Sequence, residues 1–132
     1  MTGNEYQKKA MRTNDKRASK RFSKVIHDTL NETHDIHRHT DIFCLTEGVM
    51  GLAGEVGEFT ELIKKWLFHS KTIDLNHAKK ELGDVLWYVA MVADTMGWSL
   101  EEIMQTNIKK LENRYPIKFD TQLANNRKSD DI

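Results

Sequence analysis

Two pairs of carboxylates have the type and spacing of groups that do chemistry. Glu55 and Glu58 are three residues apart, and so are Glu81 and Asp84. Residues at this spacing lie on one face of an α-helix. Each pair directly precedes an apolar residue of a helical repeat, so we expect the carboxylates to border a buried interface. If the two helices pack antiparallel through the short segment between them, both pairs face one cleft.

Four carboxylates in one cleft repel one another unless a cation lies among them. Mg²⁺ suits a site made of carboxylates, waters and substrate phosphates, and we expect Mn²⁺ to substitute for it. Such a cation neutralises phosphate oxygens and makes a bound water a better nucleophile. The pattern therefore predicts hydrolysis of a phosphoanhydride. A single pair of this kind would more often belong to a solvated helix face.

Glycine recurs at every third residue around the first acidic pair, at Gly48, Gly51, Gly54 and Gly57. Each costs roughly 1 kcal/mol relative to alanine inside a helix. A helix built for stability alone would not carry four of them. We expect these residues to allow the close approach of a ligand or of another backbone, and tight helix packing alone is the alternative explanation.

The elements that must position these residues are helices. Prolines and alternating apolar runs are scarce, so the chain is predicted to be all-α. In segments 45–66 and 82–96, apolar residues recur at steps of three and four, which is typical of helices that pack at shallow angles in a bundle. These two seams consist of Leu45, Val49, Leu52, Val56, Phe59, Ile63 and Trp66, and of Leu82, Val85, Val89, Val92 and Met96.

Capping residues predict where the helices begin and end. Asp74 or Asn76 caps the helix that carries the second seam, and Gly97 ends it. The residues at 99–102 match a capping box that starts a further helix, and Pro116 ends that one. Its inner face is expected to consist of Ile103, Met104, Ile108 and Leu111.

The flanking segments are less regular. We expect a helix from about Asn4, continued as far as Leu30 with a break near Asn14, and a polar loop at 31–40. The polar tail after residue 120 is expected to be frayed.

Composition restricts the class of protein. The 132 residues fit one domain. Lys+Arg and Asp+Glu are both 20, and this balance argues against a stable complex with nucleic acid. A single cysteine, Cys44, excludes an intrachain disulfide and fits a cytoplasmic location. The sequence shows neither a signal peptide nor an apolar run long enough for a membrane helix.

The stretch GLAGEVGEFTELIKKW, followed by KKELGDVLWYVAMVADTMGWSLEEIMQTNIKKLENRYP, resembles the MazG-like all-α nucleoside triphosphate pyrophosphohydrolases. The family signature is E-x-x-E, a spacer and E-x-x-D, which the two acidic pairs match. NEYQKKAMRT also resembles the family's first helix. The resemblance implies a single domain over 1–132, with a core at about 43–116, an insertion at 14–40 and a polar tail at 117–132. Some relatives carry an acid where this chain has Gly54, so the number of metal ions stays open.

The resemblance implies Mg²⁺-dependent hydrolysis of nucleoside or deoxynucleoside triphosphates to the monophosphate and pyrophosphate. The metal ligands and catalytic residues would be Glu55, Glu58, Glu81 and Asp84. Asn107, Lys110 and Arg114 would face the substrate, and their spacing of three and four places them on one helical stripe. Lys65 and Tyr88 lie on the stripes of the acidic residues and are further candidates for substrate binding. The base stays open, because related folds act on dUTP, dCTP or phosphoribosyl-ATP alone.

Other classes of protein fit less well. A di-iron carboxylate bundle needs Glu-x-x-His pairs, and the chain has none. A non-catalytic helical interaction module remains an alternative, since fold does not fix function. His34, His37 and His39 lack the further ligands of a compact zinc site. The three tryptophans could stack on a base, but core packing is the favoured prediction for Trp66, Trp87 and Trp98.

Several apolar residues lie outside the two seams, namely Phe43, Met50, Leu62, Leu67, Leu86 and Met91. A helix that is apolar on more than one face must bury more than one face. A second copy of the chain is the simplest cover. We therefore expect a homodimer or homotetramer with active sites at or near subunit contacts, and the family resemblance implies the same.

Overall fold

The computed structural model describes residues 1–31 and 41–125, which contain helices and no strand. The all-α prediction is thereby confirmed for this part of the chain. The chain divides into two compact units, Met1–Ile42 and Phe43–Ile132. The sequence predicts a loop at 31–40, but Asn31 belongs to a helix. Residues 32–40, with the three histidines, lie outside the described residues, and so does the end of the polar tail.

The first unit consists of α1 (Gly3–Ala10), a short 3₁₀ helix η1 (Met11–Thr13) and α2 (Ala18–Asn31). A capping box starts α1, because the Glu5 N–H donates to the Thr2 hydroxyl and the Thr2 N–H donates to the Glu5 carboxylate. The break expected near Asn14 is confirmed, since η1 ends directly before it.

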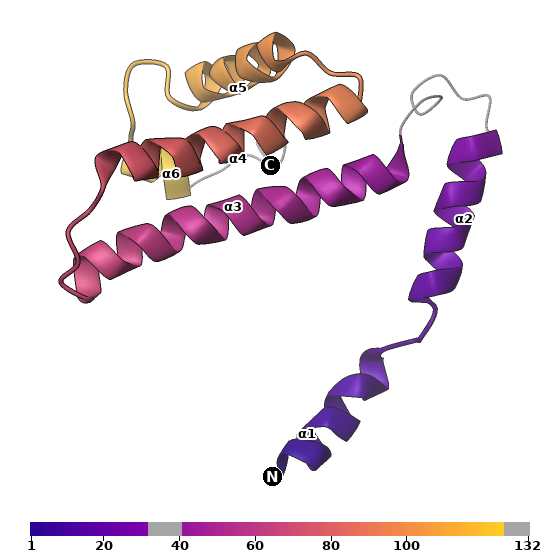
Figure 1. Ribbon diagram of the computed structural model, residues 1–132. Helices are drawn as coiled ribbons and strands as arrows, with labels where there is room; N and C mark the ends of the chain where they lie inside the picture. The colour runs from indigo at the N-terminus through magenta and orange to yellow at the C-terminus, as the bar shows by residue number, and fades with distance from the viewer. Residues whose placement is uncertain (32–40, 126–132) are drawn as a thin grey trace. The chain divides into compact units, whose positions relative to one another are not determined.

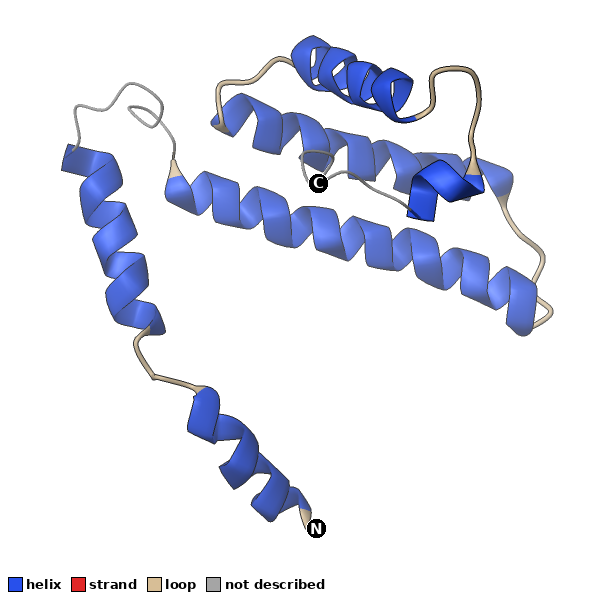
Figure 2. Ribbon diagram, turned by 180° about the vertical axis from the view of Figure 1, so that it is seen from behind, coloured by secondary structure: helices blue, strands red, loops and turns tan. Residues whose placement is uncertain are grey.

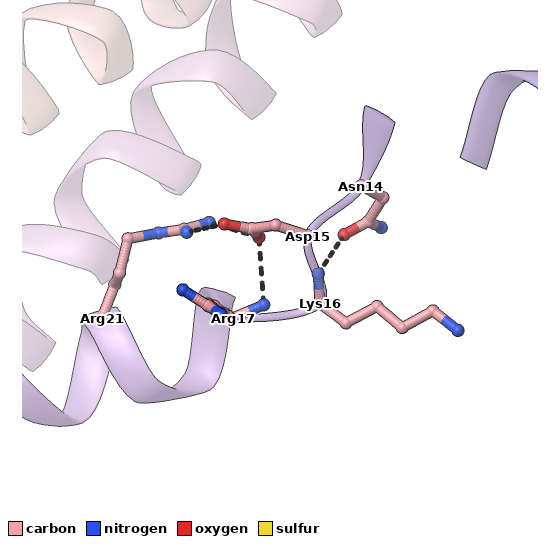
Figure 3. A network of polar contacts seen from close by, with 5 residues as sticks. All are labelled: Asn14, Asp15, Lys16, Arg17 and Arg21. Carbon is pink, nitrogen blue, oxygen red and sulfur yellow. Dashed lines mark hydrogen bonds and ion pairs between the residues drawn. The ribbon is translucent and has the colours of Figure 1, made fainter. Parts of the chain in front are cut away.

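Local polar contacts shape the connection between η1 and α2 (Figure 3). Asn14 accepts the Lys16 N–H at 2.9 Å, and Asp15 accepts the Arg17 N–H at 3.0 Å. Lys16 adopts a left-handed φ of 54°. The Arg21 guanidinium binds the Asp15 carboxylate and, together with the Arg17 N–H, lowers the pKa of Asp15. The Asn14 and Asp15 side chains thus satisfy backbone N–H groups of the connection itself.

The second unit contains α3 from its second residue on (Ile42–Phe68), α4 (Leu75–Thr95), α5 (Leu100–Arg114) and α6 (Thr121–Asn125). Figures 1 and 2 show α3 and α4 side by side and antiparallel, with α5 running back along α4. The long helices predicted for this region are confirmed.

The predicted helix ends are also confirmed. Asp74 caps α4, where its carboxylate accepts the N–H groups of Asn76 and His77 at 2.9 and 3.1 Å. Gly97 ends α4 with φ 70°, and the Trp98 N–H returns to the carbonyl of residue 93, which is a Schellman motif. Ser99 and Glu102 form the capping box that starts α5.

The prediction of a frayed tail is wrong for residues 121–125, which form α6. Asp120 starts this helix, because its carboxylate accepts the Gln122 N–H at 2.7 Å and its carbonyl accepts the Ala124 N–H at 3.0 Å. The polar composition of the segment hid the fact that an aspartate at an N-cap can begin a short helix.

Burial in the second unit differs from the prediction. Among the described residues only Gly48 and Ala93 are buried. The expected inner face of α5 is exposed, and so are the three tryptophans predicted to pack in the core. The physical reason is that α3, α4 and α5 of one chain have too few neighbours to cover their apolar faces. Within the described residues, every helix is too short or too polar to be a membrane-spanning segment.

Candidate active site

Two glycines bring α3 and α4 into direct contact. A Cβ atom placed on Gly48 would lie 2.9 Å from Cγ2 of Val92, and one on Gly51 would lie 2.1 Å from the ring of Tyr88. Real side chains do not approach so closely. Tight helix packing, the alternative explanation for the repeated glycines, therefore accounts for these two residues.

The same antiparallel register extends in both directions from these contacts. Towards the start of α3, Cys44 Sγ lies 3.3 Å from Thr95 Oγ1. Towards its end, Glu55 lies opposite Asp84, with carboxylate oxygens within 4.8 Å of each other. Each step forward along α3 is matched by an equal step back along α4. The packing of the first half of α3 thus fixes which carboxylates meet in the second.

Three carboxylates form a cluster, which we call the carboxylate triad: Glu55, Glu81 and Asp84, with oxygens all within 4.8 Å of one another. Glu55 is half-buried and Asp84 is exposed. Glu58 is not part of the triad, but its charge acts on Glu55. The predicted acidic pairs therefore face one another across two helices.

Electrostatics within the triad favour a cation. The pKa of Glu55 is raised, first by the burial of its carboxyl group and then by the charges of Glu58, Asp84 and Glu81. The donor set consists of hard carboxylate oxygens, which suit a divalent cation of the Mg²⁺ type. Such an ion would offset the repulsion that contributes to the raised pKa of Glu55.

A cavity of about 440 Å³ adjoins the acidic residues, between the end of α3 and the start of α4. Gly54 and Gly57 line it, and a Cβ atom on either would meet no atom within 4 Å. These two glycines are therefore not needed for the packing of α3 on α4 and leave open space in the cavity. Its lining consists of Gly54, Gly57, Glu58, Glu61, Leu62, Lys65, Lys71, Thr72, Ile73, Asp74, His77 and Glu81.

Lys65, a predicted substrate-binding residue, lies in this cavity together with Glu58 and Glu81. Its Nζ atom is 3.4 Å from Oε1 of Glu61. Glu61 also pairs with Lys64, and the hydrogen bonds of Lys64 and then Lys65 lower the pKa of Glu61. The cavity therefore places a cationic side chain beside the acidic residues.

Tyr88 occupies a different position. Its ring packs on the Gly51 backbone and meets the ring of Trp87 edge-on at 4.8 Å between centroids. The contact with Gly51 assigns the ring to the packing of α3 on α4. The sequence placed Tyr88 on the stripe of Glu81 and Asp84, and its role in substrate binding stays a prediction.

The remaining predicted substrate contacts lie on α5. Asn107 and Lys110 line a second hollow of about 420 Å³ with Trp98. The guanidinium carbon of Arg114 lies 5.9 Å from the ring centroid of Tyr115. The structure thus brings Lys65 to the acidic cavity and places Asn107 and Lys110 in a hollow of their own.

Sequence reasoning missed two features of the site. His77 Nε2 lies 2.7 Å from Glu81 Oε1. The connection between α3 and α4 contributes Lys71, Thr72 and Ile73 to the cavity. The histidine had a visible signal, because it precedes Glu81 by four residues and so shares its helix face. The connection had none, since its backbone path is not encoded in a periodic pattern.

Comparison with known proteins identifies the family of this chain. Residues 46–119 match the MazG nucleotide pyrophosphohydrolase domain, and this range includes all four carboxylates. "Gene 37 protein" of Mycobacterium phage L5 is 38% identical over an alignment of 69 positions, which covers 49% of this chain and 60% of the length of that protein. No solved structure matches the chain significantly. The chain belongs to the MazG nucleotide pyrophosphohydrolase domain family.

Proposed function

We propose that this protein hydrolyses nucleoside or deoxynucleoside triphosphates to the monophosphate and pyrophosphate in a Mg²⁺-dependent reaction. The observation that carries the proposal is the carboxylate triad, assembled from two antiparallel helices inside the region that matches the family. Glu55, Glu81 and Asp84 would hold the metal, with Glu58 as a fourth ligand or as a base. Bound Mg²⁺ supplies charge neutralisation for the phosphate oxygens, and Mn²⁺ would substitute for it.

The reaction adds water to the α-phosphorus and breaks its bond to the bridging oxygen, so that pyrophosphate leaves. Glu58 lines the cavity and is exposed, so it can accept the proton that the attacking water loses. Lys65 lies in the same cavity and can donate to phosphate oxygens. We further propose that Asn107, Lys110, Arg114 and Tyr88 contact the nucleotide. For Tyr88 this contact would be additional to the packing of its ring on Gly51.

Hydrolysis in H₂¹⁸O tests which bond is broken. The label is expected in the monophosphate, and pyrophosphate is expected as the second product. Chelation of the metal should stop the reaction, and Mn²⁺ should restore it. Release of inorganic phosphate and a diphosphate would show that the wrong bond has been assigned. No turnover of any nucleotide with either metal would instead favour a non-catalytic interaction module.

The range of substrates is a separate question within the same class of enzyme. A panel of the common NTPs and dNTPs, with phosphoribosyl-ATP added, measures kcat/KM for each. Similar values across the panel would support a broad specificity. A preference of more than about 100-fold, close to 3 kcal/mol of transition-state binding, would identify an enzyme for one nucleotide such as dUTP or dCTP.

We further propose that the protein functions as a homodimer or homotetramer. Met50, Leu67 and Leu86 are 70%, 56% and 63% exposed in the single chain, and they lie on the two helices that carry the triad. Burial of such residues by a second copy would be favourable. Size exclusion with light scattering over a wide dilution range tests this, and a fully active monomer would contradict it.

A further inference from the structure

The triad residue Glu81 makes a close polar contact that the proposed reaction does not use. His77 Nε2 lies 2.7 Å from Glu81 Oε1, one helical turn away on α4. The Glu81 side chain is 12% exposed and that of His77 is 57% exposed. The histidine is therefore the more exposed partner of a carboxylate that is largely withdrawn from water. Both residues line the cavity.

The start of α4 holds His77 in place for this contact. The Asp74 carboxylate accepts the N–H groups of Asn76 and His77, which fixes the first turn of the helix. These two bonds lower the pKa of Asp74, and the bond from His77 has the larger effect. Since the backbone of His77 is anchored and Glu81 follows at the fourth position, only side-chain rotations are left to be fixed.

The contact with His77 involves one of the two carboxylate oxygens of Glu81. His77 Nε2 contacts Oε1, and a cation would be bound through Oε2. At this distance, a neutral imidazole with its proton on Nε2 can donate to the carboxylate. His77 itself is not part of the carboxylate triad. His77 would therefore contact the metal ligand Glu81 and not the metal ion itself.

We propose that His77 is a positioning residue that holds Glu81 in the orientation in which it binds the metal. This inference rests on the proposed function, because it takes the triad as the metal site. Hydrogen-bond partners of metal ligands restrict the ligand to one orientation before the metal arrives, and so raise the affinity for the metal. A residue that served only helix stability would not change that affinity.

The test measures Mn²⁺ affinity by electron paramagnetic resonance, with the metal alone and the full chain. His77→Ala is expected to weaken Mn²⁺ binding by about 10-fold or more, the usual loss for such a partner. His77→Gln keeps an N–H donor at the same position and should recover most of the affinity. His69→Ala removes another exposed histidine, outside the cavity, and should bind Mn²⁺ as the native protein does.

Circular dichroism of the metal-free variants separates positioning from stability. All variants should melt close to the native temperature, because the Asp74 cap uses only the backbone of residue 77. Native affinity in His77→Ala, tighter binding in it, or no recovery in His77→Gln would each overturn the inference. If the native protein binds no Mn²⁺, the metal site and the proposed function fail as well. If it binds Mn²⁺ and hydrolyses nucleotides while His77→Ala binds equally well, only the role of His77 fails.

Discussion

Glycine has different roles in the two halves of the α3–α4 pair. In the packed half, Gly48 and Gly51 lie under Val92 and Tyr88, so closely that no side chain would fit. In the acidic half, Gly54 and Gly57 meet no atom within 4 Å and line a cavity beside the triad. A single antiparallel register runs through both halves. The close approach at Gly48 and Gly51 thus lies in one half, and it aligns the carboxylates of the other.

This division separates stability from chemistry along one pair of helices. The packed half contains the buried residues Gly48 and Ala93, and the acidic half contains the mutually repelling carboxylates. Repulsion within the triad opposes folding. The contacts of the packed half must therefore hold the carboxylates in place against this repulsion. Substitutions in the two halves should therefore change different measured quantities.

The largest expected effect is on turnover in the acidic half. Glu81→Gln keeps the size of the side chain and removes one carboxylate from the triad. We expect kcat/KM to fall by at least about 100-fold, because an electrostatic contact to the reacting groups is lost. Steady-state assays of pyrophosphate release measure this.

Glu47→Gln is the matched control for that substitution, since Glu47 is an exposed glutamate of α3 two turns before the triad. Its turnover should be native. Full activity in Glu81→Gln would remove the triad from the mechanism. An equal loss in Glu47→Gln would show that any acidic residue of the pair matters, and the contrast between the halves would disappear.

The sequence predicted the elements better than their surroundings. The bounds of α3, α4 and α5 followed from apolar periodicity and from Asp74, Gly97 and Ser99, because caps and periods are local properties. The four carboxylates were selected by the spacing of two pairs. Which three of them form the triad depends on the register between the helices, and that is set by side-chain contacts across the pair.

The glycines show why the remainder could not be predicted. All four recur at one spacing in one helix, yet two pack against α4 and two line a cavity. The difference depends on what lies opposite each residue, which a single helical pattern does not contain. The exposed face of α5 has the same origin, since periodicity identifies an apolar face but not the partner that covers it.

Gly51→Ala should affect stability in the packed half. Its new methyl group would have to displace the ring of Tyr88, which lies 2.1 Å from the Cβ position. We expect a loss of about 1–3 kcal/mol in the free energy of unfolding, the usual cost of overpacking. Chemical denaturation of the metal-free protein measures it.

Gly54→Ala is the matched variant in the acidic half. It meets open space, so the higher helix propensity of alanine should raise the free energy of unfolding by up to about 1 kcal/mol. The methyl group enters the cavity, and KM for the nucleotide should rise. Equal destabilisation by the two substitutions would contradict the division into two halves.

Glu55→Gln should raise the thermal stability of the metal-free protein, by less than the glycine substitutions change it. Because the pKa of Glu55 is raised, the ionised carboxylate opposes folding. Protonated Glu55 stabilises the fold below the ordinary pKa of 4.5, and this stabilisation is lost as the pH rises through the raised pKa. The metal-free variant should therefore melt above the native protein at neutral pH. This difference should shrink as the pH falls towards 4.5, because protonation then does what the substitution does. A difference that stays constant with pH would contradict the assignment.

The smallest expected effect belongs to Cys44→Ser, at the far end of the packed half. The Thr95 hydroxyl donates to the Met91 carbonyl at 2.8 Å, so its oxygen is left to accept from the Cys44 thiol at 3.3 Å. Serine keeps a donor there, and its shorter C–O bond weakens the contact. We expect the free energy of unfolding to change by less than about 1 kcal/mol, with kcat and Mn²⁺ affinity unchanged. If this substitution lowered Mn²⁺ affinity while the protein stayed folded, the alignment of the triad would depend on contacts along the whole helix pair. The two halves would then act as one unit, and the comparison would have to be abandoned.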